Sequence, residues 1–167
     1  MRRFDKSVLF NAGMVRTAGD IASSYSLSSC IRCGKCDRVC PSGRNGGIHP
    51  DAVIYAVADA EASSDLSRLH AEVWKCLMCH RCSLNCPEGI DVAGVILMLR
   101  YDSASSGGSP KRFRAAGNTL AAEGRAFPAT AASERSRAEL GLPPIRNDGR
   151  TTEELRAIMI RTGFCRE

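Results

Sequence analysis

Two cysteine runs with identical spacing constrain this chain more than any other feature. They occupy residues 30–41 and 76–87, and both spell C-x2-C-x2-C-x3-C-P. Each cysteine of the second run lies 46 positions after its counterpart, as Cys76 does after Cys30. This spacing is typical of ferredoxins with two cubane [4Fe-4S] clusters, in which the fourth thiolate of each run binds the other cluster. The sequence therefore predicts two [4Fe-4S] clusters.

The crossed pattern predicts which cysteines share a cluster. One set is Cys30, Cys33, Cys36 and Cys86, and the other is Cys76, Cys79, Cys82 and Cys40. Three thiolates on one tight loop can face three irons, and the proline after each run turns the chain away because it cannot continue a helix. Crossing the fourth ligand joins the two loops, so that metal binding contributes folding energy. Gly34 tolerates an unusual φ and leaves room for the inorganic core.

Two other uses of cysteine fit the pattern less well. Structural zinc sites usually combine one closely spaced cysteine pair with a second pair well downstream. Four cysteines within eleven residues, followed by proline and then repeated, do not follow that arrangement. A disulfide framework needs an oxidising compartment, which nothing in the sequence indicates.

Composition weighs against several classes of partner. The formal net charge of the 167-residue chain is +5, and anionic clusters with their thiolates would partly balance it. Five Phe, three Tyr and one Trp are too few and too scattered for base-stacking platforms, so we expect no nucleic-acid partner.

Targeting signals are not recognised either. The basic start of the chain lacks the apolar region of a signal peptide. The longest apolar run, from Val92 to Leu99, is far shorter than the roughly 20 residues that span a bilayer. We expect a cytoplasmic protein without a membrane span, in which reducing conditions leave Cys165 as an unliganded thiol.

The segments around the runs have helical patterns. His49-Pro50-Asp51 predicts a helix start, with proline in the first turn and an acid near the N-terminus. Apolar residues then recur at helical spacing, and two further helices are expected around 66–73 and 91–101. The apolar residues are Val53, Ile54, Val57, Ala60, Leu66, Leu69, Val73, Val92, Val95, Ile96 and Leu99. We predict an all-α, alpha-helical ferredoxin-like domain, with Trp74 packed over the second cluster.

Composition also suggests domain limits. We expect an extended or partner-contacting N-terminal arm at 1–28, a two-cluster domain at 29–102, a linker at 103–110 and a helical extension at 111–167. The linker is assigned from its Gly and Ser content. The extension should form helices at about 111–127 and 151–161. It is too small to bury much core, so we expect it to bind a partner protein of the same complex.

Residues beside the cysteines match a known family. They are Gly34-Lys35, Pro41-Ser42-Gly43-Arg44, Trp74 and Pro87-x-Gly89-Ile90, with Leu140-Gly-Leu-Pro143-Pro144 and Ile158-Met-Ile-Arg-Thr-Gly163-Phe164 in the tail. With these residues the chain, from about Ser29 to Phe164, resembles the C subunit of CoB–CoM heterodisulfide reductase. The Gly46-Gly47 stretch and the Gly/Ser linker match less closely, which leaves loop contacts in doubt.

The resemblance implies an electron carrier within an oxidoreductase complex. It implies two cubane clusters that pass electrons from a flavin-bearing A subunit, itself an iron–sulfur protein, to a B subunit. In this family the B subunit holds non-cubane clusters and reduces the CoM-S-S-CoB disulfide in methanogenesis. In soluble versions the A subunit bifurcates electrons, and hydrogenase or formate dehydrogenase supplies them.

The sequence contains cluster ligands but no sign of a substrate site. No nucleophile–base pair, phosphate loop or dinucleotide fingerprint is present, so we expect no catalytic residue in this chain. The alternative is the iron–sulfur subunit of another oxidoreductase, such as a sulfur-oxidising heterodisulfide-reductase-like complex or a glycerol-3-phosphate dehydrogenase. Basic residues near the runs either steer partner docking or form a solvated face. They are Arg32, Lys35, Arg38, Lys75, His80 and Arg81.

Overall fold

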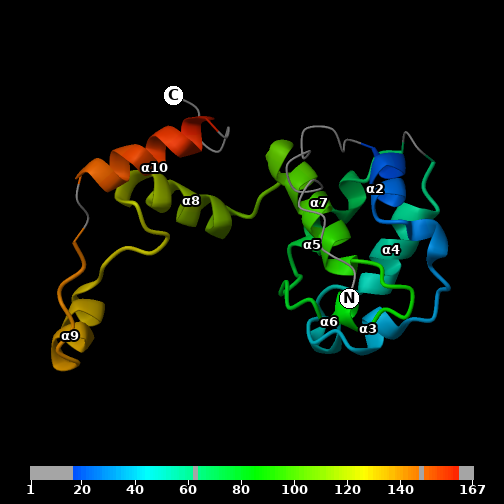
Figure 1. Cartoon of the computed structure of the whole chain (residues 1–167), viewed down its shortest axis with the longest axis horizontal. Coiled ribbons are helices and arrows are strands. Elements are labelled where there is room, and N and C mark those ends of the chain that lie inside the picture. The colour runs from blue at the N-terminus through cyan, green and yellow to red at the C-terminus, as the bar shows by residue number, and fades with distance from the viewer. Residues whose placement is uncertain (1–16, 62–63, 147–148, 162–167) are drawn as a thin grey trace. The chain divides into compact units, whose positions relative to one another are not determined.

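The computed structural model describes residues 17–61, 64–146 and 149–161, and within these ranges the chain forms helices, turns and loops without a β-strand (Figure 1). The predicted helical class is therefore confirmed. The contacts divide the chain into two compact units, of which unit 1 ends at Ser109 and unit 2 begins at Pro110. None of the helices in the described ranges has the length and apolar character needed to span a membrane.

Unit 1 contains both cysteine runs, each in a loop followed by a short helix. Its helices are α2 (Ala18–Ser24), α3 (Lys35–Arg38), α4 (Pro50–Ala58), α5 (His70–Val73), α6 (Arg81–Leu84) and α7 (Val92–Ser105). Short 3₁₀ turns lie at Leu27–Ser29, Gly43–Asn45 and Ser67–Leu69. Helices α3 and α6 contact each other at one end of the unit, which brings the two cysteine loops together (Figure 1).

The core lies where α4 and α5 pack against α7. The predicted apolar faces are largely buried, and the fully enclosed side chains are Val57, Val73, Ile96 and Leu99, with Ile54 nearly so. Burying one such side chain stabilises the fold by about 1.5–3 kcal/mol. Helix α4 starts at Pro50, as predicted, after His49 as its N-cap residue.

The predicted N-terminal arm is only partly covered, because residues 1–16 lie outside the described ranges. The remainder is not an extended arm: α2 packs against α4 and buries Ala18 and Ile21 in the core. A capping box starts this helix. The Thr17 side chain accepts from the Asp20 N–H, and the Asp20 carboxylate accepts from the Thr17 N–H.

Helix α7 is longer than predicted and occupies the beginning of the predicted linker. It continues through Ser105, and Ser103 is fully buried. The N–H of Gly107 donates to the Ala104 carbonyl, and the N–H of Gly108 donates to the Ser103 carbonyl at 2.7 Å. With φ at 78° for Gly107, this is a Schellman cap. These glycines therefore end a helix, although their composition suggested a flexible linker.

Unit 2 consists of three helices in its described part. They are α8 (Lys111–Glu123), α9 (Ala131–Glu139) and α10 (Gly149–Arg161). Helices α8 and α10 contact each other, and Met159 is buried in this unit. Helix α8 ends before Gly124, four residues earlier than the predicted end at Phe127. Helix α9 was not predicted, although Thr130 and Ser133 form a capping box at its start.

Candidate iron–sulfur site

The two cysteine loops have the same backbone conformation. Arg32 and Met78, at equivalent positions, have φ values of 52° and 51°, and the next equivalent pair, Gly34 and His80, has 67° and 59°. Left-handed φ is uncommon for residues other than glycine, so the match at two positions reflects one shared loop structure. The repeat of 46 residues in the sequence is therefore also a structural repeat.

The structure gathers the eight cysteines into two groups of four. Cavity A is lined by Cys30, Cys33, Cys36 and Cys86. Cavity B is lined by Cys40, Cys76, Cys79 and Cys82. Each cavity thus combines three cysteines of one run with the fourth cysteine of the other run. This is the grouping that a crossed pair of clusters requires.

Apolar groups complete both cavities. Ile54, Ile90 and Val92 line cavity A, while Pro50 and Ala93 line cavity B. Four thiols facing an apolar space suit an iron–sulfur cubane, which takes four thiolates and whose potential depends on solvent access. All eight thiols are free of disulfide bonds in the described chain.

Backbone N–H groups point at two of the sulfurs. The Gly43 N–H donates to Cys40 Sγ and the Met78 N–H donates to Cys76 Sγ, each at 3.3 Å. Such bonds favour the thiolate form of the sulfur.

Burial raises the pKa of several thiols. Desolvation, with a smaller contribution from the charge of Asp51, raises the pKa of Cys36 to about 12. Desolvation likewise raises the pKa of Cys82 to about 11. The pKa of Cys76 is also raised by burial, against the opposing effects of the Met78 N–H and the Arg100 charge. These thiols are protonated at neutral pH, so metal binding must release their protons.

An arginine from α7 fastens the second loop to the core. Arg100 Nε donates to the Val73 carbonyl at 2.8 Å, and its Nη2 donates to the Cys76 carbonyl. Its guanidinium lies over the Trp74 ring, 5.2 Å from the centroid. Trp74 Nε1 donates to Ser103 Oγ at 3.0 Å. Trp74 thus packs toward α7 and is not among the residues that line cavity B.

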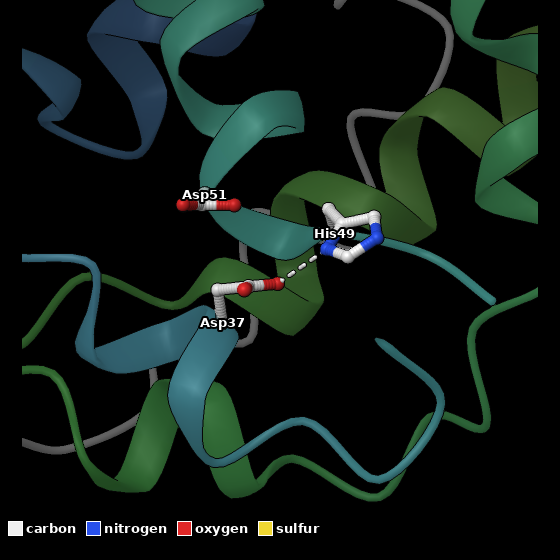
Figure 2. Close-up of side chains that lie close together, drawn as sticks. All are labelled: Asp37, His49 and Asp51. Carbon is white, nitrogen blue, oxygen red and sulfur yellow. Dashed lines mark hydrogen bonds and ion pairs between the residues drawn. The ribbon is translucent and has the colours of Figure 1, made fainter. Parts of the chain in front are cut away.

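An acidic group with one histidine lies beside the first run. Asp37 comes from α3, while His49 and Asp51 come from the start of α4, and Figure 2 shows both carboxylates near the His49 ring. His49 Nδ1 lies 3.0 Å from Asp37 Oδ1. One potential ligand atom from each of the three residues lies within 4.8 Å of the others. These carboxylates place negative charge next to the segment that carries Cys36.

The structure brings together the eight cysteines that the sequence singled out, whereas Arg100 and Ser103 were not predicted. Both residues lie near the end of α7, where a charged or small polar side chain in a sequence reads as solvent-exposed. Their partners are 24 to 29 positions away, so no local pattern reveals them. Of the basic residues near the runs, Arg32 pairs with Asp59 and Lys75 with Glu72. Cys165 lies outside the described residues.

Comparison with known proteins agrees with this site. Residues 26–90 match the family model described as a 4Fe-4S dicluster domain, and this range includes all eight cysteines. Similarity to individual relatives extends beyond this range and into unit 2, because one match spans 147 residues of the chain.

Three relatives are named as C subunits of CoB–CoM heterodisulfide reductases. The C subunit of the ferredoxin/F420H2-dependent CoB–CoM heterodisulfide reductase of Methanosarcina acetivorans is 32% identical, covering 74% of this chain and 75% of that protein. The C subunit of the ferredoxin:CoB–CoM heterodisulfide reductase of Methanosarcina mazei is 30% identical, covering 83% and 86%. The C subunit of the H2:CoB–CoM heterodisulfide,ferredoxin reductase of Methanothermobacter thermautotrophicus is 27% identical, covering 86% and 78%. With the two Methanosarcina proteins matched over most of their length, this chain belongs to the family of C subunits of CoB–CoM heterodisulfide reductase.

Proposed function

We propose that this chain is the electron-transfer subunit of a heterodisulfide reductase complex and that it holds two [4Fe-4S] clusters. The observation that carries the proposal is the sorting of eight cysteines into cavities A and B, each with three thiols of one run and one of the other. When bound, each cluster accepts and donates one electron at a time.

The residues of the chain have three tasks in this proposal. The cysteines hold the clusters, in the crossed sets that line the two cavities. The apolar walls, such as Ile54 and Ile90 in cavity A, limit the access of water. Helices α3 and α6 contact each other and keep the two cysteine loops adjacent. The two proposed clusters would then lie close enough for an electron to pass between them.

The family suggests the partners. We propose that a flavin-bearing A subunit supplies electrons and that a B subunit, with non-cubane clusters, receives them and reduces the CoM-S-S-CoB disulfide. This chain then performs no bond chemistry of its own. A hydrogenase or formate dehydrogenase would feed the A subunit, and unit 2 would contact one of these partner proteins. The relatives' names support a complex, because each is described as one subunit of a reductase.

The test has two parts. The chain, purified without oxygen, should contain about eight irons and show interacting reduced clusters by EPR. A complex isolated anaerobically from the native host should contain a flavoprotein and a protein with two CCG-type cysteine motifs. A well-folded chain without iron contradicts the cluster proposal. Co-purification with glycerol-3-phosphate dehydrogenase or with sulfur-oxidising enzymes supports the alternative oxidoreductase instead.

A further inference from the structure

The chain that follows α9 in unit 2 folds back along that helix (Figure 1). The N–H of Gly141 donates to the Ala138 carbonyl at 3.0 Å, and the φ of Gly141 is 68°. The N–H of Leu142 donates to the Arg137 carbonyl at 2.9 Å. This arrangement is a Schellman cap, which ends the helix and reverses the direction of the chain.

Two side chains of α9 hold the returning chain in place. Arg137 donates from Nε and Nη2 to the Pro143 carbonyl, at 3.0 and 2.9 Å. The Glu134 carboxylate accepts the Ile145 N–H at 3.3 Å. The rings of the two consecutive prolines fix φ at both of their positions. Helix and returning chain therefore form one small structural element, residues 131–146, which we call the α9 segment.

The α9 segment has no core of its own. None of its residues is buried, and its largest apolar side chains, Leu140, Leu142 and Ile145, are 74%, 46% and 36% exposed. A helix of nine residues is only marginally stable in water, and in proteins most helical stability comes from packing. The described part of unit 2 offers little to pack against, because Met159 is its one buried apolar side chain. Another protein surface would supply the missing contacts.

Charge indicates which kind of surface fits. Unit 2 contains eleven Lys and Arg against seven Asp and Glu, so it carries +4 of the formal +5 of the chain. In the α9 segment, Glu134 and Arg137 bind the returning chain. Arg135 and Arg146 are exposed and take part in none of the ion pairs among the described residues, against one exposed acid, Glu139. Cations beside exposed apolar side chains complement an apolar groove with an acidic rim.

Nucleic acid is a poorer match for this surface. Its phosphates attract cations, but they offer nothing to three aliphatic side chains. Base stacking needs aromatic side chains, and residues 131–146 contain none. The features of the α9 segment thus favour a protein partner.

We propose that the α9 segment is a docking element, and that Leu140, Leu142 and Ile145 enter an apolar groove with an acidic rim on another subunit of the complex. The cap and the bonds from Arg137 and Glu134 order the segment before binding, which reduces the conformational entropy lost on association. The identity of the complex rests on the proposed function, whereas the docking element is argued from unit 2 alone.

The test is photo-cross-linking in the complex isolated anaerobically from the native host. The full chain carries p-benzoylphenylalanine in place of Leu142. Illumination should link position 142 to a subunit other than this chain, at apolar residues flanked by Asp or Glu in the linked peptide. The same probe in place of Ser136 is the matched control. Ser136 lies on the other side of α9 from Glu134 and Arg137, because successive residues of a helix are about 100° apart, so it should link to that subunit far less.

Single substitutions measure how much the apolar contacts contribute. Leu142→Asp places a negative charge against the acidic rim and should reduce the partner subunit that co-purifies by about tenfold or more. Ser136→Asp adds the same charge without removing an apolar contact and should have little effect. Arg137→Gln loses the charged donor to the Pro143 carbonyl and should weaken binding, and Arg137→Lys should restore part of it. Iron content and far-UV circular dichroism of all four variants should match wild type.

Two results overturn the inference. One is a link from position 142 only to a second copy of this chain, or to no protein. The other is an equal effect of Leu142→Asp and Ser136→Asp on co-purification. If Leu142→Asp fails to fold, the cross-link decides the matter. A link to a subunit of a different oxidoreductase supports the docking element and contradicts the proposed function, so the two failures are distinguishable.

Discussion

The first and second cysteine loops share their spacing, their left-handed backbone positions and the short helix that follows. They differ in how they are attached to the core. The first loop is held by an exposed ion pair from Arg32 to Asp59, with the guanidinium also over the Tyr55 ring. The second loop is held by Arg100 and by the bond from Trp74 to the buried Ser103. The same cysteine motif thus gives the same backbone conformation in both loops, whereas the contacts that attach each loop to the core differ.

The largest effect is expected from exchanging single cysteines for serine. Crossing predicts that Cys40→Ser behaves like Cys79→Ser, because both thiols line cavity B. It predicts likewise that Cys86→Ser behaves like Cys33→Ser, because both line cavity A. Each variant should lose about half of the bound iron, as one of two clusters is lost. Iron analysis and EPR of the remaining cluster measure this.

The control for the cysteine series is Cys165→Ser, which should keep all of the iron. If Cys40→Ser instead resembles Cys33→Ser, each run binds its own cluster. The two loops would then be independent cluster sites.

Thiol reactivity gives the next effect. Burial raises the pKa of Cys36 to about 12 and of Cys82 to about 11, above the ordinary 9.0. Each pKa unit above pH 9.0 lowers the thiolate fraction roughly tenfold. In the metal-free chain, iodoacetamide at pH 9.0 should therefore alkylate these two thiols more slowly than the exposed Cys33 and Cys79. Mass spectrometry resolves the four sites, and Cys36 should react more slowly than Cys82.

The same shifts predict how alkali affects stability. In the folded state the pKa values of Cys36 and Cys82 lie above 9.0. The stability that these two protonated thiols contribute is therefore present below pH 9.0 and is lost as the pH rises toward 11 and 12. Denaturant unfolding of the metal-free chain should show this decline, and Cys36→Ser should reduce it. Equal alkylation of all four cysteines at pH 9.0 is the result that contradicts both predictions.

The contacts that attach the two loops to the core should contribute differently to the free energy of unfolding. Ser103→Ala leaves the partly buried indole N–H of Trp74 without its serine acceptor, so we expect a loss of about 1–2 kcal/mol in the free energy of unfolding. Asp59→Asn removes an exposed ion pair and should change stability very little. Urea unfolding of the loaded protein compares them. A larger loss from Asp59→Asn would show that the surface pair is the stronger attachment.

The sequence predicted those features of the fold that are set by residues close together in the chain. The apolar periods of α4 and α7 are local, so the fold class and the buried Val57 and Leu99 followed from residues a few positions apart. The thiol grouping joins two distant runs and was predicted from the ferredoxin spacing that both runs share. The start of α2 carried a local signal too, the Thr17–Asp20 capping box, which an expectation of an extended arm overlooked.

Other features depend on distant contacts. Arg100 reaches carbonyls 24 to 27 positions away, and Gly107 is a helix cap only because α7 continues to Ser105. Composition alone did not reveal that Gly107 caps α7, because glycine is as common in flexible linkers as at helix ends. The two loops divide in the same way: the sequence predicted how their cysteines are grouped, but not how each loop is attached to the core.

The smallest effect tests why glycine occupies one loop and histidine the other. At Gly34 a Cβ would meet no protein atom within 4 Å, so Gly34→Ala carries only the cost of a left-handed alanine, about 1 kcal/mol. His80 already bears that cost, and His80→Gly should change the free energy of unfolding by less than about 0.5 kcal/mol, since relief of strain opposes lost chain stiffness. Urea unfolding of both variants, with and without iron, separates two roles of Gly34. A cost that is the same in both forms reflects φ alone, whereas a much larger cost in the iron-loaded form means that the missing side chain makes room for the cluster.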